Sequence, residues 1–358
     1  MPFDRTKPYN DLPLLPPAGV DLETRAVLKR AIGASRALAE LKGAGGAIPD
    51  QLILLRSIAL QEARMSSEIE NIVTTNDAVY LALSEAKGPV DPNAKEVLRY
   101  HEALWKGMQA AKARPLSTNV LIEVVQSIKG SNLGIRRMPG TTIRNGEEII
   151  YTPPEGEDVI REKLANLERF IHEHEDLDPL VKLAILHYQF EAIHPFPDGN
   201  GRTGRILNIL YLIEKGLLEL PVLYLSRYII QNKNAYYEGL RRVTEEGAWE
   251  EWVLYMLEGI EQTALDTRSR ILAIRELMDS VRQKIQSEAP KIYTKDLVEI
   301  IFKNPYCKIA FIEEAGIAKR QTASMYLQTL ESLGLLKGIK IGREIYYLNL
   351  PLMNLLSA

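Results

Sequence analysis

The amino-acid sequence predicts a mainly α-helical protein with one β-hairpin and a separate small domain at its C-terminal end. Apolar residues recur at helical spacing through most of the 358-residue chain, as amphipathic helices require. An Asn-Gly pair between two β-prone segments predicts the hairpin. From about Lys291 onward the charge balance changes from acidic to basic, and such a change is typical of a domain boundary.

The composition is that of an ordinary soluble globular protein. Hydrophobic residues make up 46% of the chain and charged residues 25%, and the length allows two or three domains. A formal net charge of -3 gives no overall attraction to nucleic acid or to anionic membranes. The single cysteine, Cys307, excludes an intramolecular disulfide and a multi-cysteine zinc site, and its apolar neighbours predict a buried structural thiol. With no apolar leader and no membrane-length apolar run, we expect a cytoplasmic protein without a membrane partner.

The N-terminal part is expected to be helical after an extended arm. Residues 1–20 are rich in proline and predict an arm that packs on the surface. Residues 21–41 predict a helix that ends at a group of glycines. A second, long helix is expected from Asp50 to about Ile72.

The middle of the chain predicts further helices around one hairpin. Helical patterns cover residues 95–113, 119–128 and 157–173. Between them, residues 141–151 read as a hairpin, with a type I′ turn at Asn145-Gly146.

The most informative stretch is His-Pro-Phe-Pro-Asp-Gly-Asn-Gly-Arg-Thr-Gly-Arg, residues 194–205. The segment before it, 181–193, has the apolar spacing of a buried helix, and the segment after its start, 203–215, repeats that pattern up to Gly216. The stretch is therefore a glycine-rich entry to a helix N-terminus. Unpaired N–H groups and the helix dipole make such a place an anion site.

The residue types in this stretch fit a phosphate chain. Gly199 and Gly201 allow the backbone to approach an anion, Asn200 can add a side-chain donor, and Arg202 and Arg205 supply positive charge.

Two titratable side chains flank this anion site. Asp198 can hold Mg²⁺, which takes one or two carboxylates and completes its shell with phosphate oxygens and water. His194 can accept a proton from an incoming hydroxyl near neutral pH.

Two other interpretations fit parts of the stretch. Gly199-x-Gly201-x-x-Gly204 also fits the dinucleotide fingerprint, but that fingerprint needs a preceding strand, and here a helix precedes it. A capped helix-turn-helix with a basic loop would explain the glycines, but not the histidine, the aspartate and two arginines together.

These residues match the motif of the Fic-domain family, in which His, Phe, an acid, Gly-Asn-Gly-Arg and a final Arg recur at this spacing. The resemblance implies a Fic-type helical core, with ATP and Mg²⁺ as cosubstrate and cofactor. It implies transfer of AMP from ATP to a Ser, Thr or Tyr hydroxyl of a target protein and of the chain itself. By position, His194 is implied to be the base, Asp198 to hold the metal, and Arg205 to bind the γ-phosphate. The implied nucleotide-binding set is Glu70, Gly199, Asn200, Gly201, Arg202, Thr203, Gly204, Arg205, Tyr236 and Tyr237.

A second resemblance lies upstream, where Glu62, Ser66 and Glu70 recur at every fourth residue and share a helix face. Ser66, Glu70 and Asn71 are similar to the inhibitory helix of the family, which has Ser or Thr, three residues, Glu, and then Gly or Asn. The resemblance implies that Glu70 binds Arg205 and so competes with the γ-phosphate. Taken alone, the same residues would be typical of a solvated helix face.

Two further parts of the implied site remain open between alternatives. The hairpin at Ile149, Ile150 and Tyr151 is implied to be a flap that pairs with an extended target segment, or else it only covers the helices. Tyr236 and Tyr237 are implied to contact the nucleoside by their aromatic faces, or else they pack on the core. The family often has an asparagine one or two helical turns further on, where Thr244 stands here.

The C-terminal residues predict a winged helix domain. Helices are expected at 296–303, 309–315 and 320–333, followed by two strands at 335–340 and 343–349. Arg320, Gln321, Thr322 and Tyr326 lie on the candidate recognition helix.

The charge of this domain leaves its partner open. From Lys291 onward nine Lys and Arg face six acidic residues, which is a modest excess for duplex binding. DNA binding, docking of a protein and formation of a homodimer therefore all stay open.

The expected organisation has four parts: an N-terminal helical region at 1–112, the catalytic core at 113–262, a helical linker at 263–290 and the winged helix domain at 291–358. Two other functions stay open beside AMP transfer. One is removal of AMP from modified proteins by the same site, and the other is a DNA-binding regulator whose core senses a nucleotide. His172 and His174 lie two residues apart, so a helix points them in different directions and a metal site there is not expected.

Overall fold

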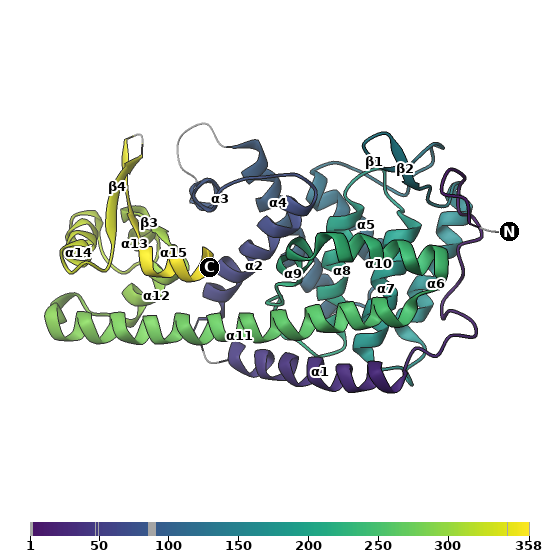
Figure 1. Cartoon of the computed structure of the whole chain (residues 1–358). Coiled ribbons are helices and arrows are strands. Elements are labelled where there is room, and N and C mark those ends of the chain that lie inside the picture. The colour runs from purple at the N-terminus through teal and green to yellow at the C-terminus, as the bar shows by residue number, and fades with distance from the viewer. Residues whose placement is uncertain (1–2, 47, 49, 85–90, 342, 358) are drawn as a thin grey trace.

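The computed structural model describes residues 3–46, 48, 50–84, 91–341 and 343–357, without the side chains of residues 52, 54 and 55. A helical body and a smaller C-terminal module lie at opposite ends of an elongated molecule, and one long helix, α11, runs along both (Figure 1). None of the described helices is long and apolar enough to cross a lipid bilayer. The helices of the body are α1 (Arg25–Gly45), α2 (Gln51–Ile69), α3 (Asn76–Leu83), α4 (Pro92–Ala113), α5 (Thr118–Lys129), α6 (Glu157–His172), α7 (Pro179–Ile193), α8 (Asn200–Glu214), α9 (Leu225–Gln231), α10 (Lys233–Glu246) and α11 (Trp249–Glu288).

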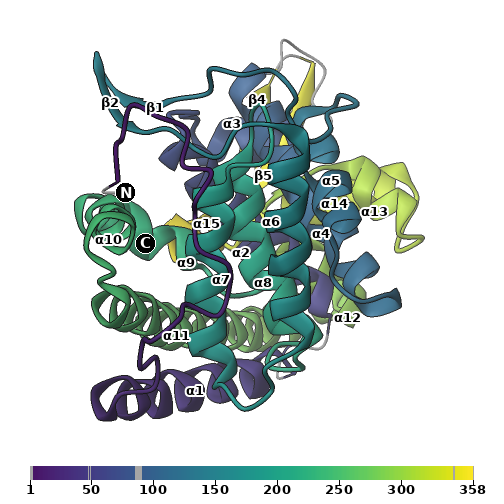
Figure 2. The same cartoon turned by 90° about the vertical axis from the view of Figure 1, so that its right-hand side faces the viewer.

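The core of the body is the antiparallel pair α7 and α8. Nearly every residue of both helices is buried, because α1, α4, α5, α6 and α11 pack against them (Figure 2). His187 of α7 lies in this core as a neutral side chain, since burial lowers its pKa to about 3. Its ring stacks on Trp252 of α11, whose indole N–H donates to the Ala184 carbonyl at 2.7 Å. The apolar helix expected before the His194 stretch is therefore the centre of the fold.

The predicted hairpin is present, but its turn differs from the expected type I′. Strands β1 (Ile143–Asn145) and β2 (Glu148–Tyr151) pair antiparallel with a bulge after Ile143. The two loop residues are Gly146 and Glu147, and only Gly146 has a positive φ, of 60°. A positive φ at the first loop residue alone is the pattern of a type II′ turn, and the glycine supplies it.

The N-terminal arm packs along the body, as expected. The Tyr9 N–H donates to the Thr152 carbonyl at 3.0 Å, and Arg5 forms an ion pair with Glu148 of β2. Leu12 and Leu15 of the arm are buried. The arm therefore ties the base of the hairpin to the body.

Three helix boundaries differ from the prediction. Helix α1 continues through Gly43 to Gly45, because a glycine only weakens a helix that tertiary contacts hold. Helix α2 ends at Ile69 and not near Ile72. Helix α11 runs 40 residues without a break past residues 262 and 263, where the expected core and linker meet. Gly259 lies close to this point, but a glycine only weakens a helix, and Tyr228 and Leu225 pack closely against it.

The C-terminal module contains the three predicted helices and two predicted strands. They are α12 (Lys295–Lys303), α13 (Ile309–Glu314), α14 (Arg320–Ser332), β4 (Lys337–Ile341) and β5 (Glu344–Leu348). Three short elements were not predicted: η1 (Pro290–Ile292), β3 (Tyr306–Cys307) and α15 (Leu350–Ser357). Strand β3 joins the hairpin in a three-stranded antiparallel sheet of order β3-β5-β4. Cys307 is buried in it, as expected.

The module packs on α2 and α3 as well as on α11. Arg56 of α2 donates to the Asn304 side chain at 3.0 Å. Tyr80 of α3 stacks on Tyr306 of β3, with ring centroids 6.1 Å apart. The N-terminal half of α2 is therefore part of the interface between body and module.

We expect Trp252→Ala to lower the free energy of unfolding by about 3–5 kcal/mol, as for large aromatic side chains removed from a core. Trp105→Ala is the matched control, because the Trp105 side chain is only partly buried. Urea unfolding followed by circular dichroism measures both. Equal losses in the two variants would contradict the central role given to α7 and its neighbours.

Candidate functional site

His194 lies directly after α7, in a backbone conformation that only a few residues adopt. Its φ and ψ are 49° and 58°, in the left-handed region, where non-glycine residues are uncommon. Its N–H donates to the Phe190 carbonyl at 3.0 Å and closes the helix. The chain therefore reverses at His194 and presents the imidazole beside the start of α8.

Arg136, which the sequence analysis did not identify, holds this reversal in place. Its side chain is 4% exposed and donates to the carbonyls of His194 at 2.8 Å and Ile193 at 3.3 Å, as well as to that of Pro154. Its own N–H donates to the Pro195 carbonyl at 2.9 Å. One guanidinium thus binds both the end of α7 and the segment that leaves the hairpin.

The environment of His194 keeps the imidazole neutral at pH 7. Burial is the largest cause and the charge of Arg136 the next, and against the opposing charge of Glu70 they lower the pKa of His194 to about 4. The Nδ1 atom is buried and has no hydrogen-bond partner among the described residues. A neutral imidazole with a free ring nitrogen can accept a proton.

Helix α8 begins with open backbone donors. Gly199 precedes it with a φ of 84°, and the first intrahelical bond runs from Thr203 N–H to the Gly199 carbonyl at 3.0 Å. The N–H groups of Asn200, Gly201 and Arg202 come before that bond and have no intrahelical acceptor. The predicted anion site therefore has the expected backbone geometry.

The Asn200 side chain braces the loop. Its Oδ1 accepts from Phe196 N–H at 2.8 Å, and its Nδ2 donates to the Phe196 carbonyl at 2.7 Å. In this arrangement Asn200 offers an anion its backbone N–H and not its side chain.

The two arginines of the motif are buried and paired with acids from other helices. Arg202 donates to Glu96 of α4 at 2.9 Å, and its Nε has no partner among the described residues. Arg205 donates through Nε to the Ser66 hydroxyl at 2.8 Å, and through Nη2 to the Ser66 carbonyl and to Glu70 Oε1 at 2.9 and 2.8 Å. The structure thus brings Ser66 and Glu70 to Arg205, which lies 139 and 135 residues further along the chain.

The Glu70 carboxylate lies over the first turn of α8. A Cβ placed on Gly201 would overlap Glu70 Oε1, so the carboxylate occupies the space beside that glycine. The charge of Arg205 outweighs the effect of burial and lowers the pKa of Glu70, which is therefore ionised. The chain thus places its own carboxylate over Gly201, beside the open N–H groups of α8.

Asn71 explains how Glu70 reaches this position. Asn71 has a φ of 62°, Ile72 N–H donates to the Ser67 carbonyl, and Asn71 N–H donates to the Glu68 carbonyl, both at 3.0 Å. These bonds form a Schellman cap, whose left-handed residue is usually Gly and sometimes Asn. The cap ends α2 at Ile69, and Glu70, the next residue, extends its side chain to Arg205.

Glu62, on the same face of α2, fixes the middle of the helix. Its carboxylate accepts from the Ser226 N–H at 3.0 Å, from the Ser226 hydroxyl, and from the Tyr100 hydroxyl at 3.4 Å. The side chain is 1% exposed, and burial raises its pKa to about 7. The four-residue spacing correctly predicted that Glu62 shares a face of α2 with Ser66 and Glu70. The spacing could not identify its partners, which lie on α4 and α9.

Asp198 is exposed at the edge of the site. Its carboxylate forms an ion pair of 2.5 Å with Lys129 at the end of α5, and hydrogen bonding from Lys129 together with its charge lowers the pKa of Asp198 against the effect of burial. No group of three or more His, Cys, Asp or Glu side chains among the described residues could enclose a metal ion. One exposed, ionised carboxylate beside an anion site nevertheless fits Mg²⁺, which is often held by one protein carboxylate together with phosphate oxygens.

Tyr236 and Tyr237 have different surroundings. Tyr236 is buried, and its hydroxyl lies 2.8 Å from Nε2 of His187. Tyr237 is 46% exposed, and its ring contacts that of Tyr236 edge to face. Only Tyr237 has an open aromatic face. Thr244 bonds Tyr188 at 2.9 Å and so lies in the core contact of α10.

The remaining predicted residues belong to the first turns of α8 and to strand β2. Thr203 and Gly204 are buried in the first turns of α8, and the Thr203 hydroxyl has no partner among the described residues. Ile149, Ile150 and Tyr151 are partly buried, and the Tyr151 hydroxyl donates to the Ala192 carbonyl at 2.8 Å. The hairpin is thus attached to the end of α7, close to His194.

Glu191 is a second carboxylate of the site that the sequence analysis missed. Its Oε1 is buried without a partner in the described structure and lies against Gly204, where a Cβ would overlap it. Burial raises its pKa to about 7, and the nearby charge of Arg205 opposes that rise. Glu191 lies three residues before His194, near the end of α7. This position is the one sequence signal that could have identified it.

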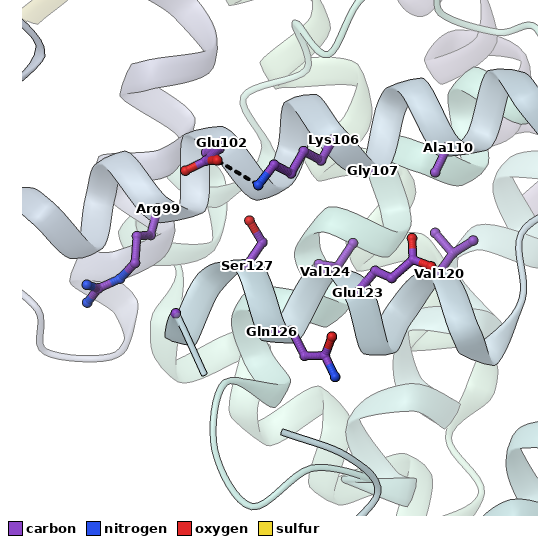
Figure 3. Close-up of a pocket in the computed structure, with 11 residues that line it drawn as sticks. Arg99, Glu102, Lys106, Gly107, Ala110, Val120, Glu123, Val124, Gln126 and Ser127 are labelled. Atoms are coloured by element: carbon purple, nitrogen blue, oxygen red, sulfur yellow. Dashed lines mark ion pairs between the residues drawn. The ribbon is translucent and has the colours of Figure 1, made fainter. Parts of the chain in front are cut away.

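A groove of about 480 Å³ between α4 and α5 lies outside this site (Figure 3). Its lining includes Arg99, Lys106, Glu123 and Gln126, and Lys106 pairs with Glu102 at 2.6 Å. None of the motif residues lines it, so the groove is not the anion site.

Three family profiles match the chain. "Fic/DOC family N-terminal" matches residues 28–109, "Fic/DOC family" matches 92–212, and "Protein adenylyltransferase SoFic-like, C-terminal domain" matches 277–352. Among curated proteins, a probable protein adenylyltransferase of Aquifex aeolicus is 30% identical over 152 residues, which cover 42% of this chain and 37% of that protein. The protein adenylyltransferase fic-1 of Caenorhabditis briggsae is 38% identical over 68 residues, covering 18% and 13%. The matches thus span less than half of these relatives.

Solved structures show the same fold. A Fic family protein from Desulfovibrio desulfuricans G20 superposes with a TM-score of 0.58 at 20% identity, over 91% of this chain and 96% of that chain. Fic-1 from Caenorhabditis elegans superposes with a TM-score of 0.52 at 19% identity, over 68% and 74%.

We expect His194 to titrate near pH 4, well below an ordinary histidine, because burial and Arg136 disfavour its charged form. Arg136→Gln should raise this pKa, and Glu70→Gln should lower it further, since Glu70 favours the charged imidazole. NMR titration of the imidazole signals, assigned with His194→Ala, measures the shifts. Titration of His194 between pH 6 and 7 would contradict the described environment.

Proposed function

Because this chain belongs to the Fic/DOC family, we propose that it is a protein adenylyltransferase that moves AMP from ATP to a hydroxyl of a target protein and of itself. The observation that carries this proposal is the meeting of a neutral His194, the open N-terminus of α8 and the guanidinium of Arg205 in one place. A base, an anion site and a phosphate clamp are the parts that such a transfer needs. The protein names of the matched relatives support the same activity.

The anion site of α8 is where we place the phosphates of ATP. The open N–H groups of Asn200, Gly201 and Arg202 and the positive end of the helix dipole favour negative charge. Arg205 would bind the terminal phosphate, because its planar guanidinium matches phosphate oxygens in pairs. Tyr237 would lie near the nucleoside, since its ring is exposed beside the site.

In the transfer step, the acceptor hydroxyl oxygen attacks the α-phosphorus. A new O–P bond forms, the bond between the α-phosphorus and the bridging oxygen breaks, and pyrophosphate leaves with that oxygen. The hydroxyl proton passes to the imidazole of His194. Such base assistance contributes typically ~10²–10⁴-fold, and the positioning of charge by the α8 turn supplies the rest.

We propose Asp198 as the protein ligand of Mg²⁺. The metal would neutralise charge on the phosphates when bound. The ammonium group of Lys129, which pairs with Asp198 here, would have to leave that carboxylate and would then lie free beside the phosphate chain.

We propose that Glu70 inhibits the transfer. Its carboxylate takes the guanidinium of Arg205 and the space over Gly201, both of which a terminal phosphate would need. Ser66 supports the inhibited arrangement by binding the same guanidinium through its hydroxyl and its carbonyl. ATP therefore has to displace Glu70 before its phosphates can align.

The hairpin is our candidate for docking the target. The Tyr151 hydroxyl attaches the hairpin to the Ala192 carbonyl, close to His194. The N-terminal arm already binds the Thr152 carbonyl through the Tyr9 N–H. An extended target segment that adds a strand by main-chain hydrogen bonds would be held in a fixed register against His194. In the same proposal the C-terminal module is a winged helix domain, because its helix–strand–helix–helix–hairpin order and its sheet are those expected of one.

Removal of AMP by the same site is the second candidate. The observation that favours it is the ionised Glu70 carboxylate, whose charge acts on His194 and which could orient a water molecule. Incubating an AMP-modified target with the protein in pyrophosphate-free buffer tests it, because hydrolysis consumes only water and releases AMP, whereas reversal of the transfer needs pyrophosphate and yields ATP.

We expect His194→Ala to reduce AMP transfer by about 10²–10⁴-fold, as loss of a general base does. Labelled ATP and gel autoradiography measure the transfer. His174→Ala is the control, because His174 also has a positive φ, of 57°, but lies away from the motif. Unchanged labelling in His194→Ala would exclude His194 as the base.

We expect Glu70→Gly to raise self-modification about tenfold, since a charge-assisted hydrogen bond of about 1.5–3 kcal/mol no longer holds Arg205. Mass spectrometry after incubation with ATP measures the added AMP and its position. Glu68→Gly is the matched control, because it removes a carboxylate of the same helix that pairs with Arg64 at 3.1 Å instead. Equal labelling of Glu70→Gly and wild type would remove the inhibition proposal.

A further inference from the structure

The C-terminal module carries a group of exposed cations that AMP transfer does not use. Lys319 and Arg320 lie at the start of α14, and Lys337, Lys340 and Arg343 lie on the β4–β5 hairpin. None of these five has an ion pair with another described residue, whereas three other cations of the module do bind partners. Lys295 pairs with Glu299, Lys303 pairs with Asp50, and Lys308 donates to the Ser84 carbonyl at 2.9 Å.

The acidic residues near these cations are engaged locally. Glu331, at the end of α14, accepts from Gly338 N–H at 2.8 Å. Glu344 accepts from the Tyr346 hydroxyl at 2.9 Å. The other acids of the module lie on α12 and α13, so the five cations of this surface face only two carboxylates and an excess positive charge remains.

The outer face of α14 has the residue types that read bases. Ala323, Leu327 and Leu330 are buried against the module. On the opposite side Gln321, Met325 and Gln328 are exposed at a spacing of four and three residues, which aligns them in one stripe. Glutamine pairs with adenine through two hydrogen bonds, and an apolar side chain contacts the thymine methyl group.

The rest of the chain leaves this surface open. Figure 1 shows α14 and the hairpin at the end of the molecule that lies farthest from the N-terminal arm, with α11 below them. Helix α14 packs against β4, so its stripe and the cations of the hairpin belong to one continuous part of the module.

We propose that the C-terminal module binds duplex DNA, with α14 in the major groove and the cations of the hairpin and of the first turn of α14 on the phosphates. The major groove of B-form DNA is wide enough for one α-helix. The major groove of duplex RNA is too deep and narrow for side chains to read, which favours DNA over RNA. This proposal is independent of AMP transfer, because none of these residues lies near His194.

The test is binding of the full-length protein to a labelled random-sequence duplex of about 20 base pairs, followed by fluorescence anisotropy between about 50 and 200 mM salt. Five phosphate contacts predict a slope of about -4 to -5 in a plot of log affinity against log salt. The double variant Arg320→Ala/Lys340→Ala should weaken binding at least about tenfold and reduce the slope by about two. Both residues are exposed, so the fold should be unaffected.

Lys291→Ala/Lys295→Ala is the matched control. It removes the same charge from exposed positions of the module but on η1 and α12, away from the proposed surface, and it should leave the slope nearly unchanged. Three results would overturn the proposal: no binding of the full chain at about 50 mM salt, equal losses in both double variants, or equal affinity for a duplex RNA of the same sequence.

Discussion

The contact between Arg205 and the end of α2 is the interaction on which the site depends. Arg205 is buried and charged, and a buried charge without a partner is strongly destabilising. Ser66 and Glu70 provide that partner from a helix distant in sequence. The same contact holds the Glu70 carboxylate over Gly201 in the first turn of α8, so one interaction both neutralises the buried guanidinium and covers the start of that helix.

The reversal between α7 and α8 is the second constraint. Both helices are buried on nearly all sides, so the loop that joins them has little freedom. Arg136 holds the left-handed conformation of His194. Its side chain donates to the carbonyls of Ile193 and His194, and its backbone N–H donates to the Pro195 carbonyl. This arrangement leaves the carbonyls satisfied and the N–H groups of α8 open, which is what an anion site requires.

Much of the site could be predicted from the sequence, because its main parts are local. The helices on both sides of the His194 stretch, the glycine-rich entry to α8 and the shared face of Glu62, Ser66 and Glu70 all follow from short-range patterns. Arg136, Glu96 and Lys129 could not be identified in this way, because each meets the motif only through tertiary packing. Glu191 lies within the motif helix, but its role depends on the contact with Gly204 across two helices.

The fold shows the same division between local and tertiary causes. Helix α11 was expected in two parts, but Gly259 does not break it, because Tyr228 and Leu225 pack closely against that glycine. Strand β3 and helix α15 are too short to have a pattern of their own and depend on neighbours already in place. The turn of the hairpin lies one residue later than expected, because the pairing of Asn145 with Glu148 leaves Gly146 as the first loop residue.

The unbroken course of α11 sets the distance between the two ends of the protein. Forty residues at 1.5 Å each give a helix about 60 Å long, and packing against α1 and α15 stiffens it. The helix is a rigid spacer and not a flexible tether. Any molecule bound at the far end of the C-terminal module is therefore held at a fixed distance from the His194 imidazole. A molecule that contacts both the module and His194 must itself be long enough to span that distance.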